Sequence, residues 1–305
     1  MKIATERFEI EARGDADCLW TYRGKDTAPV KVGAPVFEID GEAVCARLTD
    51  ICQPARPAPL GDVCTEYRFR GPFAERPEVW LEMVFRVAQA SPVVRFRYVL
   101  GSAKPCTLTK AAGHDELSYL GLSLAGLPVV KEVQVANFNE LVHSYCLVEN
   151  DLAPCHFENR ARVMGPILMA VDGASTLLAA YEHGSQVPDA FLCYVLSPDG
   201  KVELRAAKGN YCHGQEVGPS CPYETIWLQV AAVKGNEDAL AREYRTFVLR
   251  HQTLNKGSRR PYVFYNTWAF QERNKWWNGR AYLDSMTQER MLQEVEVAHR
   301  MGIEV

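Results

Sequence analysis

Hydrophobic and polar residues alternate with a period of two through most of residues 1–235, which is the pattern of half-buried β-strands. The strongest examples are 80–87 and 93–100, two runs that are rich in β-branched and aromatic residues and are joined through Ala-Ser-Pro. In the second run Arg95 and Arg97 share one face, and apolar side chains occupy the other. These runs therefore predict neighbouring antiparallel strands of a sheet with one face in the core.

Further short strands are predicted at fairly regular intervals along the same part of the chain. They cover 36–41, 132–136, 167–171, 176–181, 191–196, 202–206 and 225–233. Many short strands with few helices between them are typical of a large antiparallel sandwich. About 235 residues is too long for a simple seven-strand sandwich. We therefore expect an extended sandwich of two sheets, a β-supersandwich, over residues 1–235.

The apolar residues change to helical spacing after residue 235. Asn236 can cap a helix whose apolar positions begin at Leu240. The helix is expected to end before 255–261, a basic stretch rich in turn residues that has the composition of a linker. We therefore assign residues 236–260 to a linking helix and a linker.

The last part of the chain, residues 261–305, predicts one β-strand and one helix. The strand, 262–265, is almost entirely apolar, as is typical of a parallel strand that is buried on both faces. A long polar and aromatic loop is expected over about 269–284, and Ser285 or Thr287 is expected to begin the helix. Strand, loop and helix form one βα unit, whereas a (β/α)8 barrel needs about 250 residues. The chain thus predicts a mainly β fold that is followed by a linking helix and the first βα unit of a truncated barrel.

The composition is that of a globular protein with a core, because 47% of the 305 residues are hydrophobic and 24% are charged. The formal net charge of −4 gives no indication of a nucleic-acid partner. No apolar run approaches the roughly 20 residues that a membrane-spanning helix needs, so no membrane association is expected. The N-terminal residues also lack the apolar core of a signal peptide, which favours a cytoplasmic location.

The ten cysteines indicate neither a metal site nor a disulfide framework. No two of them form a C-x-x-C pair, which zinc ribbons and redox motifs require. We expect free thiols in a reducing compartment. Gly-rich phosphate loops and the H-E-x-x-H motif are also absent from the sequence, so we expect no cofactor and no metal.

Residues 261–268, which read PYVFYNTW, resemble a segment of a known family. They are similar to the opening barrel strand of glycoside hydrolase family 36, the microbial α-galactosidases, in which a YNSW or YNTW tetrapeptide occurs. The helix that follows ends in 298–304, AHRMGIE, which is similar to the family's A-x-x-x-G-I-E/D pattern. Residues 222–225 resemble the start of a strand near the end of the family's sandwich. The family's N-terminal supersandwich, linking helix and barrel follow the same order as the elements predicted here.

The resemblance implies a retaining glycosidase that acts on terminal α-linked galactosyl residues by double displacement. The implied ligand is an α-galactoside or a related oligosaccharide. In the family the nucleophile and the acid/base are Asp residues on later barrel strands, which correspond to positions beyond Val305. The resemblance therefore implies an α-galactosidase-like parent enzyme, with no catalytic residue in this chain and no activity of this chain alone. Galactose, N-acetylgalactosamine and transfer to an acceptor all occur among relatives, so the sugar stays open.

Four residues are candidates for substrate binding. The resemblance places Trp268 at the sugar pocket, where an indole can cover the apolar face of galactose, and the alternative is a core tryptophan. Asn266 either lines the same pocket or holds loop backbone. Trp276 and Trp277, in the expected loop, either form an outer sugar subsite or an oligomer contact, or dock the loop onto the rest of the protein.

Two other functions stay open on the sequence. A sandwich can be a non-catalytic carbohydrate-binding module, and it can be an oligomerisation domain, which leaves a homo-oligomer open. The apolar strand and the amphipathic helix at the end of the chain favour the enzyme, because a binding module needs neither. The neighbours Glu182 and His183 are interpreted as surface residues of a turn, since adjacent strand residues face opposite sides.

Overall fold

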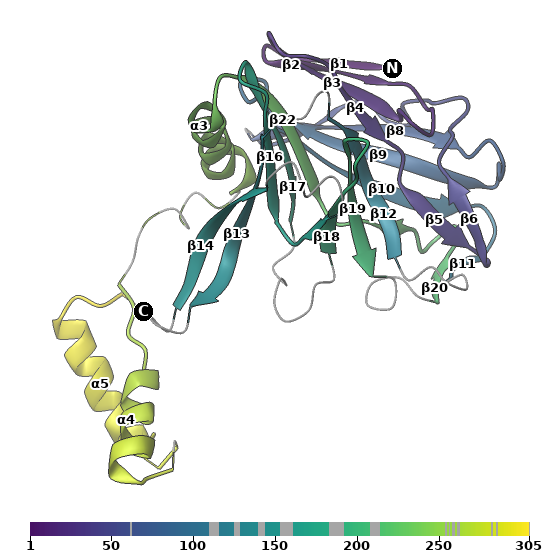
Figure 1. The fold of residues 1–305 in the computed structure, drawn as a ribbon. Helices are drawn as coiled ribbons and strands as arrows, with labels where there is room; N and C mark the ends of the chain where they lie inside the picture. Colours follow the sequence, from purple (N-terminus) through teal and green to yellow (C-terminus); the bar gives the residue numbers. More distant parts are fainter. Residues whose placement is uncertain are drawn as a thin grey trace. The chain divides into compact units, whose positions relative to one another are not determined.

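The computed structural model describes residues 1–61, 63–109, 116–124, 129–139, 144–152, 161–182, 192–207, 214–253, 255, 257, 260, 263–281, 283–284 and 286–304. Over these residues the protein is mainly β, and two large antiparallel sheets dominate it (Figure 1). The predicted fold class, a large antiparallel sandwich followed by a few helices, is confirmed.

The first sheet contains twelve strands and begins at the N-terminus. Its main path runs β1-β2-β3-β4-β12-β19-β18-β15. Off this path, β5 pairs with β12, β6 and β11, and β11 pairs with β20. The strands are β1 (Lys2–Ala4), β2 (Phe8–Ala12), β3 (Trp20–Gly24), β4 (Val30–Gly33), β5 (Val36–Ile39), β6 (Glu42–Cys45), β11 (Cys106–Leu108), β12 (Glu116–Ser123), β15 (Ala161–Val163), β18 (Leu192–Leu196), β19 (Lys201–Ala207) and β20 (Gln215–Val217).

The second sheet contains ten strands. Its main path runs β14-β13-β16-β17-β22-β10-β9-β8-β7, and β21 pairs with β10. The strands are β7 (Ala58–Leu60), β8 (Cys64–Pro72), β9 (Val79–Val87), β10 (Val94–Ser102), β13 (Val129–Asn139), β14 (Ser144–Leu152), β16 (Ile167–Val171), β17 (Ser175–Tyr181), β21 (Tyr223–Glu224) and β22 (Leu228–Lys234).

Strand β10 shows how the predicted alternation becomes a buried and an open face. Phe96 and Tyr98 are fully buried, whereas Arg95 and Arg97, which alternate with them, are only partly buried. Its neighbour β9 pairs with it along nine residues, from Val87 opposite Val94 to Val79 opposite Ser102. The two sequence runs that predicted adjacent antiparallel strands are therefore confirmed as β9 and β10.

The core between the two sheets contains a group of packed aromatic rings. Trp20 of the first sheet meets Phe85 and Phe96 of the second sheet edge to face, with ring centroids 5.1 and 4.8 Å apart. Its indole Nε1–H donates a hydrogen bond to the hydroxyl of Tyr98, 3.2 Å away. Because Trp20 is fully buried, this hydrogen bond satisfies the one polar atom that the ring brings into the core.

Helix α3 (Glu237–Phe247) covers part of the outer face of the second sheet, against β17 and β22 (Figure 1). The side chain of Asn236 caps the helix by accepting a hydrogen bond from the backbone N–H of Ala239, 3.3 Å away. Leu240 and Phe247 are buried in a second apolar cluster on this face. The helix predicted from Asn236 is therefore confirmed, and a short π-helix, Val248–Gln252, follows it.

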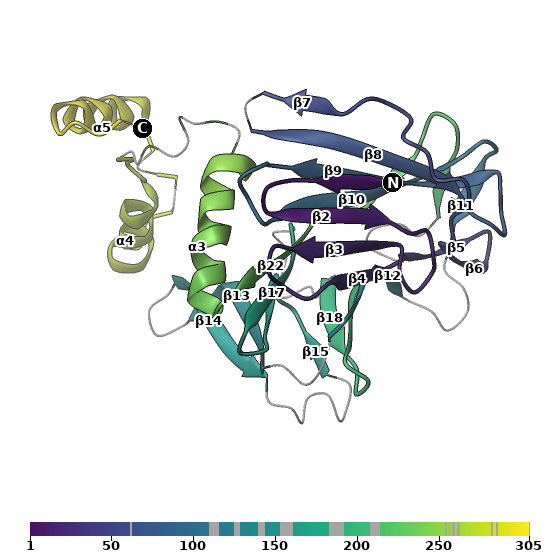
Figure 2. The same cartoon turned by 90° about the horizontal axis from the view of Figure 1, so that it is seen from above.

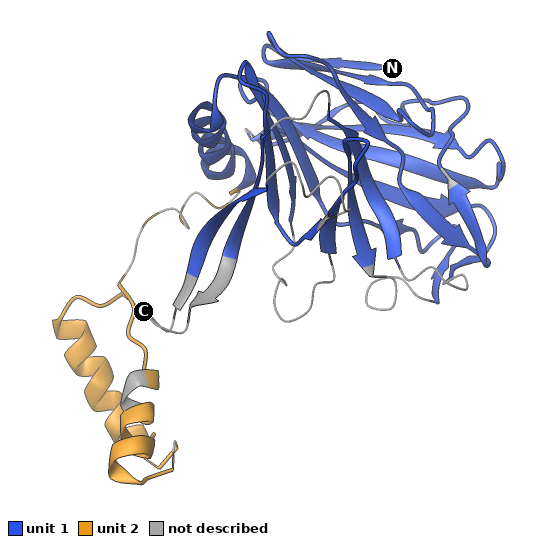
Figure 3. Ribbon diagram, in the orientation of Figure 1, with its two compact units in different colours: residues 1–252 blue, residues 253–305 orange. Residues whose placement is uncertain are grey.

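The chain divides into two compact units, residues 1–252 and 253–305 (Figure 3). Helix α3 belongs to the first unit, which also contains both sheets. The three predicted segments, 1–235, 236–260 and 261–305, were defined by sequence pattern, whereas the two units are defined by contacts between residues. The three segments therefore stay predictions.

In the second unit, the predicted loop over 269–284 is wrong, because helix α4 (Trp268–Asn278) occupies most of it. The segment WAFQERNKWWN contains Ala, Gln, Glu, Arg and Lys, all of which favour helices. Gly279 ends the helix in the left-handed conformation, with φ of 59°, and its N–H donates to the carbonyl of Asn274. The high content of polar and aromatic residues suggested a loop, but it did not oppose a helix.

The predicted second helix is confirmed as α5 (Gln288–Arg300). Thr287 is its N-cap, and the Thr287 side chain accepts a hydrogen bond from the N–H of Arg290 at 3.3 Å. Gly302 follows the helix with φ of 75°, which a glycine adopts without strain.

The strand predicted at 262–265 is not formed by its described residues, Val263, Phe264 and Tyr265. A strand is defined by repeated hydrogen bonds to a neighbour. Here the N–H of Glu304 donates a single hydrogen bond to the carbonyl of Val263, at 2.8 Å. This contact joins the segments before α4 and after α5.

Seven cysteines in the described part of the chain carry free thiols, namely Cys18, Cys52, Cys64, Cys106, Cys146, Cys193 and Cys221. Cys155 and Cys212 lie outside the described residues, and the side chain of Cys45 is not described. Within the described residues, no helix has both the length and the apolar character that crossing a membrane would need.

Candidate substrate-binding site

The four predicted site residues all lie in the second unit, on helix α4 or directly before it. Trp268 is the first residue of α4, so it does not end the barrel strand that residues 261–268 resemble. Its side chain is 63% exposed, which excludes a core role within the described unit. The chain turns into the helix at Thr267, earlier than the sequence pattern predicted.

Asn266 holds the start of this helix. Its side-chain Oδ1 accepts a hydrogen bond from the backbone N–H of Trp268, 2.9 Å away. Thr267 contributes next to it, because its hydroxyl accepts a hydrogen bond from the side chain of Gln271 at 2.8 Å. The bond from Asn266 holds the backbone at the start of α4, which is one of the two roles that the sequence left open for Asn266.

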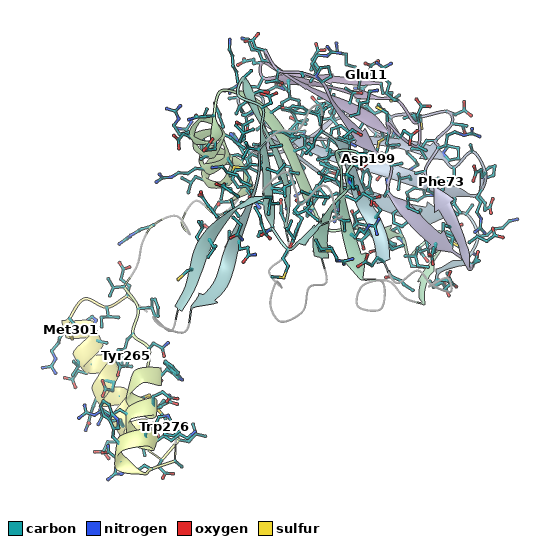
Figure 4. All side chains as sticks on the ribbon, in the orientation of Figure 1. Glu11, Phe73, Asp199, Tyr265, Trp276 and Met301 are labelled. Atoms are coloured by element: carbon teal, nitrogen blue, oxygen red, sulfur yellow. The ribbon has the colours of Figure 1, made fainter. Side chains whose placement is uncertain are left out.

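Trp276 and Trp277 lie near the end of α4 and are 69% and 78% exposed. Figure 4 shows Trp276 on this helix. The indole N–H of Trp276 donates to the carboxylate of Glu272, 2.6 Å away and one helical turn earlier. The ammonium of Lys275 lies 4.9 Å from the centre of the Trp276 ring. Trp276 is thus partly held by charged neighbours on its own helix.

The geometry of the helix decides which of these tryptophans can act together. At about 100° per residue, Trp268 and Trp276 lie roughly 80° apart around the axis, whereas Trp277 lies roughly 180° from Trp268. Trp268 and Trp276 can therefore contribute to one surface. Trp277 faces the opposite side of α4, so the three rings do not form one platform.

Beside these residues, the segment before α4 and one face of α5 enclose a hollow of about 370 Å³. The Tyr265 hydroxyl donates a hydrogen bond to the carboxylate of Glu294 across it, at 3.1 Å. The pKa of Tyr265 is raised mainly by partial burial and further by this hydrogen bond to a carboxylate. Met291, Val295 and Ala298 contribute apolar walls to the hollow, and Thr267, His299 and Glu304 add polar groups to its lining.

The sequence analysis missed a charged and aromatic cluster on the outer face of the second sheet. Three guanidinium groups, those of Arg86, Arg95 and Arg97, lie 4.3, 4.2 and 4.7 Å from the ring centre of Trp227. The only available signal was that Arg95 and Arg97 share a polar strand face, because nothing local marks Trp227 as their partner. We call these four residues the Trp227 cluster.

Carboxylates balance most of the positive charge of the Trp227 cluster. Glu182 accepts two hydrogen bonds from Arg95, at 2.6 and 2.7 Å, and one from Gln229 at 2.6 Å. Its predicted role as a surface residue of a turn is therefore wrong, whereas His183 lies outside the described residues. Burial is the main reason why the pKa of Arg97 is lowered.

The deeply buried glutamates of the first unit are held by donors as well. Glu82 is 2% exposed and accepts hydrogen bonds from Arg68 and Arg70. Glu132 is 3% exposed and accepts from the N–H of Gly165 and from Asn150. Each carboxylate is thus held by donors of the fold itself, which suits both side chains to structural roles. No group of three or more potential metal ligands occurs among the described residues.

Neither a protein-family model nor a curated protein matches the sequence. Solved structures do match its fold. The family GH36 α-galactosidase AgaA from Geobacillus stearothermophilus, in complex with raffinose, matches with a TM-score of 0.63 and 8% sequence identity. This match covers 100% of this chain and 49% of the AgaA chain. The α-galactosidase from Lactobacillus brevis matches with a TM-score of 0.57 and 11% sequence identity, and this match covers 100% of this chain and 47% of the L. brevis chain. The galactosidase domain of an α-galactosidase–sucrose kinase matches with a TM-score of 0.61 and 8% sequence identity. This match covers 100% of this chain and 49% of that domain's chain.

These similarities define the class of fold. Over its whole length the chain has the fold of a family GH36 α-galactosidase, as the resemblance of residues 261–268 implied. The chain spans about half the length of the solved structures that it matches.

Proposed function

We propose that this chain is the N-terminal part of a retaining, α-galactosidase-like glycoside hydrolase that acts on terminal α-linked galactosyl residues. The observation that carries the proposal is the match of the whole chain to about half of several α-galactosidases, one of them in complex with raffinose. The YNTW sequence at 265–268 supports it from the residues themselves. An α-galactoside or a related oligosaccharide is the proposed substrate.

In the proposed mechanism, one Asp carboxylate attacks the anomeric carbon and a second one protonates the leaving oxygen, both from barrel strands beyond residue 305. Two deeply buried carboxylates of the first unit, Glu82 and Glu132, support this assignment, because guanidinium, amide or backbone donors of the fold already hold them.

The test compares two lengths of the protein. Residues 1–305 are expected to leave an aryl α-galactoside intact, and a chain extended along the downstream reading frame is expected to hydrolyse it. Because the extension supplies both carboxylates, the rates should differ by at least about 10⁴-fold. An aryl β-galactoside is the control and should resist both chains. Turnover by residues 1–305 that persists through rigorous purification would contradict the proposal.

Within this enzyme we propose that Trp268 contacts the sugar. Its exposed indole can cover the apolar face of a galactosyl ring, an interaction worth about 1–2 kcal/mol by analogy with aromatic pairs. In the extended chain, Trp268→Ala should therefore lower kcat/KM about tenfold or more, and Trp268→Phe should recover part of the loss. Trp277→Ala is the matched control, because this ring lies on the opposite side of α4. A drop in Tm without a change in kcat/KM would make Trp268 a packing residue instead.

A further inference from the structure

A basic cleft lies in the first unit, at a place where five parts of the sequence meet. They are the residue before β2, the turn between β3 and β4, the turn between β9 and β10, the end of β22 and one face of α3 (Figure 2). Its volume is about 740 Å³, which is within the range of small-molecule sites. Four cationic side chains line it, those of Arg7, Lys25, Lys234 and Arg242.

The charges of the cleft are unbalanced. Two carboxylates, Asp26 and Glu243, accompany the four cations, so the cleft carries +2 in a chain whose net charge is −4. Glu243 is already paired with Arg7, with 2.6 Å between Oε1 and the guanidinium nitrogen. Lys25, Lys234 and Arg242 form no ion pair with any carboxylate that the structure describes. Gathered in one concavity, they raise the local concentration of anions.

The walls and floor of the cleft are held in place. Arg7 connects α3 to the turn between β9 and β10, because its guanidinium also donates to the carbonyl of Ala90 at 3.3 Å. Below it, the fully buried hydroxyl of Tyr22 donates to the carbonyl of Pro92 at 2.7 Å and accepts from the N–H of Ala232 at 3.3 Å. Pro92 and Ala232 both line the cleft. The floor of the cleft and Arg7 are therefore preformed, whereas Lys25, Lys234 and Arg242 are exposed at its rim.

We propose that this cleft binds the phosphate group of a small phosphorylated molecule, with Lys25, Lys234 and Arg242 as its cationic contacts. Lysine and arginine donate charge-assisted hydrogen bonds to phosphate oxygens, and a phosphate dianion would balance the excess charge of the cleft. The volume exceeds that of a phosphate ion and leaves space for an organic part. All the residues involved belong to the first unit, whereas the sugar-binding residues proposed on α4 belong to the second unit.

Isothermal titration calorimetry on the whole chain at low ionic strength tests the proposal. The probes are inorganic phosphate, a hexose 6-phosphate and the same hexose without phosphate. The triple variant Lys25→Ala/Lys234→Ala/Arg242→Ala should weaken phosphate binding at least about tenfold. The control variant Lys31→Ala/Lys104→Ala/Arg56→Ala removes the same charge from exposed residues that do not line the cleft, and it should bind as the unmodified chain does.

Each outcome decides the question. Binding of inorganic phosphate and hexose phosphate, lost in the cleft variant and kept in the control, supports the proposal, and a higher affinity for the hexose phosphate identifies an organic ligand. Binding that the control variant weakens equally would be a general charge effect and would overturn it. Failure of both phosphates to bind the unmodified chain would overturn it as well. Circular dichroism and Tm of each variant show that the fold is retained.

Discussion

Replacing Trp20 with alanine is expected to lower the free energy of unfolding of the first unit by about 3–5 kcal/mol. The ring is fully buried between the sheets, against Phe85 and Phe96, and its loss leaves a large cavity that rigid strands on both sides cannot close. The substitution also leaves the Tyr98 hydroxyl without the indole donor. Urea unfolding followed by circular dichroism measures the change.

Two controls define the cause of that loss. Trp20→Phe keeps an aromatic ring and should cost clearly less than Trp20→Ala. Trp277→Ala makes the same exchange at a side chain that is 78% exposed, and it should change the stability by less than about 0.5 kcal/mol. Equal effects at positions 20 and 277 would show that the centre of the sandwich is not packed as the structure has it.

Gly101→Ala is expected to destabilise the protein by about 3 kcal/mol or more, although it adds a single methyl group. Gly101 of β10 lies opposite Trp80 of β9, and a Cβ at Gly101 would be 1.9 Å from an atom of the indole ring. The ring would have to move, and with it the Arg70 guanidinium that lies 3.9 Å from its centre. The conflict is steric, because the backbone of Gly101 is not in the left-handed region.

The matched control is Gly121→Ala, on β12 of the other sheet. A Cβ there would have its nearest neighbour at 3.9 Å, so this exchange should be neutral or stabilise by up to about 1 kcal/mol. A second variant isolates the contact with the indole. In a Trp80→Ala background the space above Gly101 is empty, and Gly101→Ala should then cost little. A large cost that persists in that background would contradict the steric explanation.

The sequence predicted those elements whose signal is local. Strand β16 was predicted with its observed bounds, since an apolar run between turn residues is enough to define it. Asn236 was recognised as a helix start, and Thr287 was one of two candidates with Ser285, because capping depends on residues within three positions. Alternation along β10 was sufficient to separate its buried aromatic residues from its arginines.

Elements that depend on distant partners could not be predicted in the same way. The partners of Glu182 are Arg95 and Gln229, which adjoin it only after three strands have aligned. Helix α4 was missed because an aromatic and charged segment is compatible with both a loop and a helix, and helix propensity is a weak signal. The strand predicted at 262–265 needs neighbouring strands to form a ladder, and one hydrogen bond to Glu304 is not a ladder.

For the candidate substrate site, the sequence named residues but not their arrangement. The tetrapeptide YNTW directed attention to Asn266 and Trp268. The structure adds that the Asn266 side chain accepts from the N–H of Trp268 and that a helix begins there. That Trp277 faces away from Trp268 depends on the helix as well. The roles of these residues in sugar binding stay predictions.

The position of β22 has a consequence for synthesis of the protein on the ribosome. This strand inserts between β10 and β17, which are completed earlier in translation, and it pairs with both of them. At about 5–20 residues per second, the nascent chain carries an open edge on β10 for on the order of ten seconds before Leu228 emerges. An unpaired edge is a template for pairing with other chains, so this interval is when a chaperone would matter most. A ribosome that pauses after β17 and before β22 has emerged would lengthen the exposure.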